Sequence, residues 1–187
     1  MRLFIALDFP DAVRERLCEL IGRLKTKSRG VRWVRPEGMH ITIKFIGETD
    51  SRCVEPIRAA LATIHSPQPV EMNFHGLGFF PHEREPRVLW CGIEASSNLA
   101  SLAADVANAL APLGFPAEAR PFVPHLTLAR FPNPKNVQEI VRAANELKSY
   151  EFGSARESEF HLIESKLKPS GAEYTRLASF AFLKEAA

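Results

Sequence analysis

The amino-acid sequence predicts an α+β protein built from two similar lobes. Two short stretches that read as β-strands match each other, Met39-His40-Ile41-Thr42-Ile43 and Pro124-His125-Leu126-Thr127-Leu128. The same order of a strand, a turn, a motif strand and an amphipathic helix recurs around each stretch. No flexible linker separates the two copies. We therefore expect residues 1–187 to form a single compact domain of two pseudo-symmetric lobes, each with an antiparallel sheet and helices.

The first half of the chain begins with a strand and a helix. Arg2 to Phe9 is apolar enough for a buried strand, and Pro10 suits the first turn of a helix. The apolar residues of this helix recur at helical spacing: Val13, Leu17, Leu20, Ile21 and Leu24. A short strand over residues 31–34 precedes the first motif strand, which we expect to run to about Ile46. Pro56 fits only in the first turn of the next helix, whose apolar residues are Val54, Ile57, Leu61 and Ile64.

The middle of the chain predicts two strands and a third helix. Residues 70–80 and 87–93 read as strands on either side of a polar turn over residues 81–86. Ser97 is a suitable N-cap for the helix that follows. The apolar residues of this helix are Leu99, Leu102, Val106 and Leu110.

The second motif strand precedes one more helix and two more strands. Asn133 and Pro134 fit the cap and the first turn of this helix. Its apolar residues are Val137, Ile140, Val141, Ala144 and Leu147. Residues 159–166 and 174–183 read as the final strands, around a turn at Pro169-Ser170-Gly171.

Each motif strand places an imidazole beside a hydroxyl. Side chains alternate between the two faces of a strand, so His40 and Thr42 share one face, as do His125 and Thr127. The apolar residues between them point the other way, toward a core. With the two lobes facing each other, two imidazoles and two hydroxyls meet in one groove.

These groups suit chemistry at a phosphate ester. Imidazole titrates near neutrality, so one histidine can deprotonate a water molecule while the other protonates a departing ribose oxygen. Threonine hydroxyls can donate hydrogen bonds to the non-bridging oxygens, where charge develops. Attack of water on a 2′,3′-cyclic phosphate can use this set of groups without a metal.

Segments along nearly the whole chain carry a resemblance to a known family. They are Arg2–Asp8, Trp33–Val34, His40–Glu48, Pro86–Trp90, Pro124–Arg130, and Ser165 through Gly171 to Tyr174. With its paired H-x-T-x motifs, the chain resembles the two-histidine (2H) phosphoesterases. Within them it is similar to the bacterial and archaeal RNA 2′,3′-cyclic phosphodiesterases, also called 2′-5′ RNA ligases. The resemblance implies a bilobal α+β fold with the active site in a groove between the lobes.

The resemblance also implies an activity and a role for each motif residue. It implies metal-independent hydrolysis of RNA 2′,3′-cyclic phosphate ends to 2′-phosphate ends, and 2′-5′ joining of RNA ends as the reverse type of reaction. His40 matches the proton donor of the family and His125 the proton acceptor, roles that spacing alone leaves open. Thr42 and Thr127 complete the expected catalytic set. RNA ends that bear a cyclic phosphate, including those of tRNA fragments, are the expected partners, and no cofactor or metal is expected.

Two basic residues beside the motifs are candidate substrate contacts. Lys44 shares strand parity with Thr42, so we expect its cation to face the groove. Arg130 has the opposite parity from His125 and reaches the groove only if the strand ends or twists there. Simple solvation is the alternative for both, because most Lys and Arg side chains lie at the surface.

Other residues fit structural roles better than functional ones. Four histidines without a patterned neighbour are expected at the surface or at caps: His65, His75, His82 and His161. Most aromatic residues are expected in the core. Five of them are candidates to stack on a nucleobase: Trp33, Phe79, Phe80, Trp90 and Phe122. A basic run either guides an RNA strand or is simply solvated: Arg23, Lys25, Lys27, Arg29, Arg32 and Arg35.

Composition and charge restrict the compartment and the partners. A formal net charge of +2 argues against wrapping a long polyanion. The N-terminal apolar run is too short for a signal peptide, and no later run approaches a membrane span. The three separated cysteines, Cys18, Cys53 and Cys91, form no disulfide framework. We expect a monomer in the cytoplasm without a membrane partner.

Three alternative functions stay open. A non-catalytic module would bind RNA ends in the same groove and leave them intact. A 2H hydrolase would act on a small cyclic nucleotide instead of an RNA end. A two-histidine metal-dependent hydrolase is disfavoured, because no carboxylate lies near either motif strand in a ligand-like position.

Overall fold

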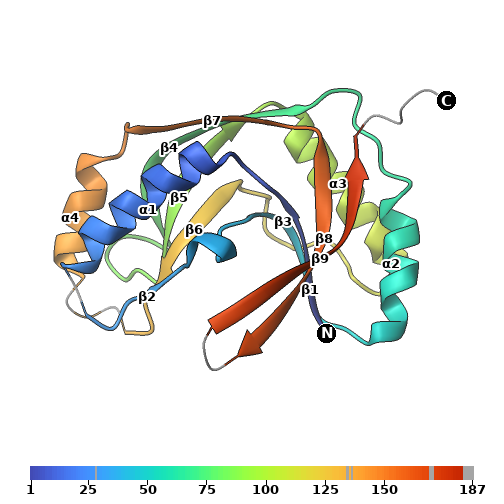
Figure 1. Cartoon of the computed structure of the whole chain (residues 1–187), viewed down its shortest axis with the longest axis horizontal. Coiled ribbons are helices and arrows are strands. Elements are labelled where there is room, and N and C mark those ends of the chain that lie inside the picture. The colour runs from blue at the N-terminus through green and yellow to red at the C-terminus, as the bar shows by residue number, and fades with distance from the viewer. Residues whose placement is uncertain (28, 134, 136, 169–170, 183–187) are drawn as a thin grey trace.

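The computed structural model of the chain describes residues 1–27, 29–133, 135, 137–168 and 171–182. Within these residues the strands form two antiparallel sheets, which Figure 1 shows side by side. Sheet A has the strand order β3 (Ile41–Glu48), β1 (Arg2–Leu7), β8 (Glu159–Lys168) and β9 (Gly171–Ala181). Sheet B has the order β2 (Arg32–Trp33), β6 (His125–Arg130), β5 (Val88–Ala95), β4 (Val70–Phe80) and β7 (Glu151–Glu157).

Each sheet has its own pair of helices. Helices α1 (Asp11–Lys25) and α4 (Gln138–Glu146) pack on sheet B, where α1 contacts β7 and α4 contacts β4. Helices α2 (Val54–Leu61) and α3 (Asn98–Leu110) contact each other beside sheet A, and α3 contacts β3. The fold is thus bilobal and α+β. Among the described residues, no helix is long and apolar enough to cross a membrane.

The two lobes do not correspond to the two halves of the sequence. Strand β1 belongs to sheet A, but the helix that follows it, α1, covers sheet B. In the same way, β5 belongs to sheet B and the next helix, α3, packs against β3 of sheet A. The C-terminal strands β8 and β9 return to sheet A. The repeated order seen in the sequence is therefore interleaved between the lobes.

One apolar core joins the two lobes. Its members include Leu3, Ile5 and Leu7 of β1 and Leu126 and Leu128 of β6, all with no exposed side-chain surface. The motif strands β3 and β6 also contact each other across the boundary between the sheets. The two sheets therefore share one continuous cluster of buried apolar residues.

Two residues predicted at helix starts have different outcomes. Ser97 occupies the N-cap position of α3, but its side chain makes no capping hydrogen bond. The neighbouring Ser96 hydroxyl donates instead to Asn98 Oδ1 at 2.5 Å. Pro56 is the third residue of α2, in its first turn as expected.

Strand β7, at the edge of sheet B, was not predicted from the sequence. Only Phe152 and Ala155 of its residues are buried, and Gly153 adopts a φ of 133° that distorts its pairing. This leaves too little apolar alternation to mark a strand. The final strands are longer toward their turn than expected, whereas Pro134, Ser170 and Leu183 lie outside the described residues.

Candidate active site

The two histidines enter their sheets in the same way. His40 directly precedes β3 and follows the 3₁₀ turn Pro36–Gly38, while His125 is the first residue of β6. From His40 to Phe45 the side chains are half-buried, buried, half-buried, buried, buried and exposed. The six residues from His125 to Arg130 have the same pattern. The similarity of the motifs thus extends to their burial.

A β-bulge in each motif strand explains the two consecutive buried positions. In sheet A, Thr42 pairs with Ala6 of β1, and Lys44 pairs with the adjacent Ile5. Ile43 is therefore the extra residue on β3. In sheet B, Thr127 pairs with Trp90 of β5 and the pairing shifts before Ala129. A bulge reverses the face of every residue that follows it. The alternation of side chains between the two faces of the strand therefore shifts by one residue directly after Thr42 and directly after Thr127.

The bulge corrects the expectation for Lys44. Its side chain lies on the same face as Ile5, toward the core, and is only 5% exposed. The Lys44 ammonium donates to the carbonyl oxygen of Pro116 at 2.6 Å. Lys44 therefore ties β3 to the segment after α3 and does not share a face with Thr42.

The same change of face at each bulge brings Arg130 and Phe45 to the faces that carry the motifs. Arg130 pairs with Val88, which lies on the same face of β5 as Trp90, the partner of Thr127. Phe45 pairs with Phe4, and their ring centroids are 6.0 Å apart. Phe45 is 53% exposed, which is unusual for a phenylalanine. Phe45 was not predicted at the site, because simple alternation puts its side chain on the opposite face of β3 from His40 and Thr42.

A backbone carbonyl orients each histidine ring. His125 Nδ1 lies 2.8 Å from the carbonyl oxygen of Val123, two residues earlier. His40 has a hydrogen bond to the backbone of Gly38, also two residues earlier. When Nδ1–H of His125 donates to this carbonyl, Nε2 is left to accept or donate a proton.

Aromatic side chains pack against both rings. The His40 ring lies 5.0 Å from Tyr174 and 5.5 Å from Phe4, measured between centroids. The His125 ring meets Phe80 edge to face at 4.9 Å. Phe80 is thus one of the expected aromatic candidates that reaches a motif. Phe4 and Tyr174 carry no such sequence signal, because their contact with His40 depends on the pairing of distant strands.

Burial and charge act in opposite directions on His40. Burial lowers the pKa of its imidazole below the ordinary value, and the negative charge of Asp8 raises it in part. Asp8 forms an ion pair with Arg176 and lies 3.6 Å from His161 Nε2. His161 was expected at the surface or at a cap, but it is 1% exposed within strand β8, and its Nδ1 lies 2.9 Å from Ser179 Oγ. This cluster, of which only His161 is buried, places the Asp8 carboxylate near His40.

Arg14 of α1 holds the turn that leads to His40. Its guanidinium donates to the carbonyl oxygens of Pro36 at 2.7 Å and Met39 at 3.2 Å. It also lies 4.3 Å from the centre of the Phe9 ring. A helix that covers sheet B thus fixes the backbone in front of a motif strand of sheet A.

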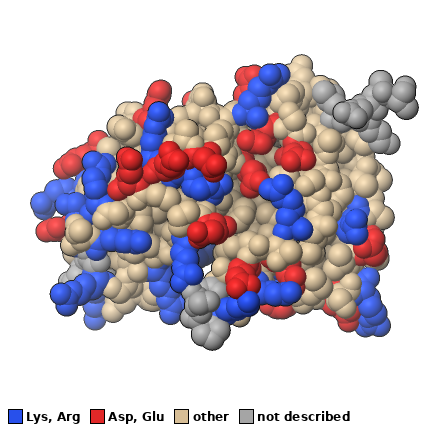
Figure 2. Space-filling view, viewed as in Figure 1, with Lys and Arg blue, Asp and Glu red and all other residues tan. Residues whose placement is uncertain are grey.

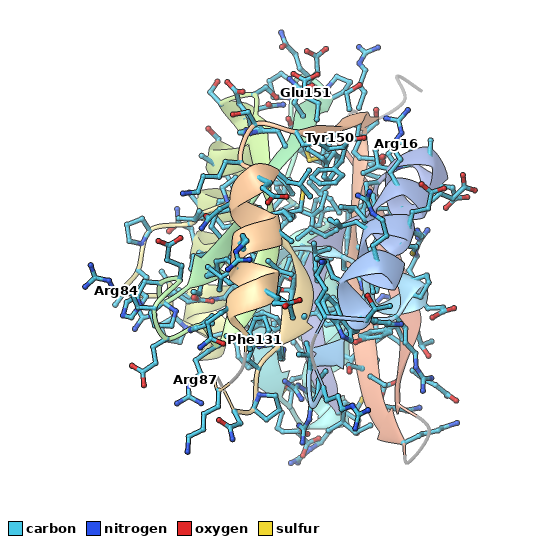
Figure 3. The ribbon with its side chains drawn as sticks, turned by 90° about the vertical axis from the view of Figure 1, so that its left-hand side faces the viewer. Arg16, Arg84, Arg87, Phe131, Tyr150 and Glu151 are labelled. Atoms are coloured by element: carbon cyan, nitrogen blue, oxygen red, sulfur yellow. The ribbon has the colours of Figure 1, made fainter. Side chains whose placement is uncertain are left out.

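Two hollows of the surface lie away from the motifs. One of about 580 Å³ is lined by α4 and by Glu83 and Arg84, and another of about 840 Å³ lies between α1 and Tyr150. Figure 3 shows the second with Arg16 and Tyr150 at its upper end. Neither contains a motif residue. Within the described part of the chain, no group of three or more His, Cys, Asp or Glu side chains could hold a metal ion.

The chain is similar to known proteins over nearly its whole length. Residues 7–90 and 93–174 match the family of LigT like phosphoesterases. An RNA 2′,3′-cyclic phosphodiesterase of Methanothermobacter thermautotrophicus is 33% identical over 96% of this chain and 98% of that protein. An RNA 2′,3′-cyclic phosphodiesterase of Archaeoglobus fulgidus is 37% identical over 96% of this chain and 99% of that protein.

Solved structures share the fold. TT0787 of Thermus thermophilus has a TM-score of 0.79 and 30% identity, covering 97% of this chain and 98% of that one. E. coli LigT complexed with 3′-AMP has a TM-score of 0.76 and 25% identity, covering 98% of both chains. Both similarities extend across the two lobes.

Proposed function

Because the chain belongs to the LigT-like phosphoesterase family, we propose that it is an RNA 2′,3′-cyclic phosphodiesterase. It hydrolyses a 2′,3′-cyclic phosphate at the end of an RNA strand and leaves a 2′-phosphate. The observation that carries the proposal is the matched pair of motifs, each with a carbonyl-oriented histidine and a threonine on one face of its strand.

The two histidines act on opposite sides of the phosphorus atom, one on the attacking water and the other on the leaving oxygen. His125 takes a proton from water as the water oxygen bonds to phosphorus. The bond from phosphorus to the 3′ oxygen breaks, and His40 gives that oxygen its proton. Burial lowers the pKa of free His40, and a bound phosphate anion restores its charged form. The proton donor is thus best populated when the substrate is present.

Hydrogen bonds stabilise the charge on the non-bridging oxygens. Thr42 and Thr127 donate their hydroxyls to these oxygens in the transition state. Arg130, brought to the motif face by the bulge, adds a positive charge farther along β6, beside the reacting phosphate and not on it. Phe45 offers an exposed ring on the opposite lobe, where a nucleobase can stack. The two motif faces bound the groove that holds the RNA end.

The same groups can join RNA ends. When a 5′-hydroxyl of a second strand replaces water as the nucleophile, the 3′ oxygen leaves as before and a 2′-5′ phosphodiester forms. The proposal places this chemistry in the cytoplasm and in a monomer, with tRNA fragments among the substrates. Cys18, Cys53 and Cys91 are free thiols, which accords with a reducing compartment.

A single reaction tests the proposal. An oligonucleotide that ends in a 2′,3′-cyclic phosphate is incubated with the protein and EDTA, and ³¹P NMR identifies the product. A 2′-phosphate end is expected at an undiminished rate. Recovery of intact substrate in a bound complex would instead indicate a non-catalytic RNA-end module. Activity that EDTA removes and added metal restores would indicate a metal-dependent hydrolase.

A further inference from the structure

Two arginines lie directly opposite each other on β2 and β6. Arg32 pairs with Arg130, and the next pair along the strands is Trp33 with Ala129. Ala129 is fully buried, so this second pair faces the core. Both arginines are exposed and therefore lie on the other face of sheet B.

This outer face is the one that carries the second motif. The bulge at Leu128 places Arg130 on the same face as Thr127, as its pairing with Val88 shows. Arg32 shares that face, because directly opposite residues of an antiparallel pair point the same way. The motif face of β6 therefore continues from Thr127 to a pair of guanidinium groups.

The arginine pair is unfavourable without an anion. Like charges directly opposite each other destabilise an antiparallel pair. Beyond the backbone pairing of their strands, neither the Arg32 nor the Arg130 side chain forms a hydrogen bond or an ion pair with another of the described residues. Figure 2 shows Lys and Arg side chains gathered at the lower left of the molecule, where Figure 1 draws β2. The local charge thus favours a phosphate bound between the two side chains.

We propose that Arg32 and Arg130 form a second phosphate subsite, which binds the phosphodiester on the 5′ side of the terminal nucleotide. This inference rests on the proposed function. Arg130 lies three residues after Thr127, on the order of 10 Å along the strand. A neighbouring phosphate of the same RNA strand falls within reach of these long side chains. The subsite makes the enzyme select RNA ends over mononucleosides that lack a 5′-phosphate.

Two small substrates isolate the contribution of this phosphate. They are adenosine 2′,3′-cyclic phosphate with a 5′-hydroxyl and the same compound with a 5′-phosphate. We expect the wild-type protein to have a kcat/KM about tenfold higher for the 5′-phosphorylated compound, the gain from one exposed charge-assisted contact. In Arg32→Gln the ratio of the two values falls toward one, because only Arg130 is left to contact the phosphate, and in Arg32→Lys an intermediate ratio is retained.

Arg87→Gln is the matched control. Arg87 directly precedes β5, near Arg130, but its guanidinium donates to the Pro132 carbonyl oxygen at 3.3 Å and points outward in Figure 3. We expect Arg87→Gln to keep the wild-type ratio of kcat/KM between the 5′-phosphorylated and the 5′-hydroxyl compound, although it removes one positive charge. A wild-type ratio near one, or an unchanged ratio in Arg32→Gln, overturns the subsite while hydrolysis itself continues. Failure to hydrolyse either compound, or an RNA end, overturns the proposed function as well.

Discussion

Replacement of Gly78 by alanine tests whether packing beside the second motif, on the same face of sheet B, supports catalysis. Gly78 of β4 lies directly opposite Trp90 of β5, which in turn lies opposite Thr127 of β6. A Cβ atom at position 78 would lie 2.2 Å from the indole ring of Trp90. Carbon atoms in contact are about 3.5–4.0 Å apart. The indole must therefore move by more than about 1 Å, since the contact is with its rigid ring.

The displaced indole pushes on the surroundings of His125. The Trp90 ring lies 5.3 Å from Phe80, and Phe80 lies 4.9 Å from His125, between centroids. Overpacking of this kind costs about 1–3 kcal/mol of folding stability. A misplacement of about 1 Å in a catalytic group can lower the rate about 100-fold. We expect Gly78→Ala to remain folded and to lose about 10- to 100-fold in kcat/KM, by the same reasoning.

Denaturant unfolding and the hydrolysis of a cyclic-phosphate oligonucleotide measure the two effects. Gly22→Ala is the control, because nothing lies within 4 Å of a Cβ atom at this position in α1. It should stabilise the fold by up to about 1 kcal/mol, since alanine favours a helix, and leave kcat/KM unchanged. Wild-type kcat/KM in Gly78→Ala, with stability lowered as expected, would refute the link between Trp90 and His125.

Four further substitutions test residues in and around the motif strands. His40→Ala and His125→Ala should each lower kcat by about 10²–10⁴, and the double variant should lose far less than the product of the two; full activity in His125→Ala would refute the assignment. Asp8→Asn removes the charge that raises the pKa of His40, so that pKa falls further and the alkaline limb of the kcat/KM profile, where the proton donor is lost, moves to lower pH. An unmoved limb would contradict this role. Lys44→Met should lower the free energy of unfolding by about 1–3 kcal/mol, the contribution of a charge-assisted hydrogen bond, with an unchanged KM for substrate. A raised KM at wild-type stability would return Lys44 to the substrate site.

Local sequence patterns were sufficient for the main elements and for the motif strands. A strand or a helix buries one side of itself, so its apolar residues recur with the period of that element. The stripes of α1 and α3 were read in this way, and their predicted apolar residues are buried. The alternation around His40 and His125 likewise placed each histidine beside a threonine. The edge strand β7 was missed because it buries too few residues to leave a pattern.

The sequence by itself determined that this protein has two imidazole–hydroxyl couples, each on a strand with a buried opposite side. Only the tertiary structure decided what surrounds them. The bulges at Ile43 and Leu128 turn Lys44 inward and Arg130 outward, and they exist only in the pairing of β3 with β1 and of β6 with β5. The exchange of helices between the lobes is also a result of packing. Register and packing depend on partners far away in the chain, and no local period records them.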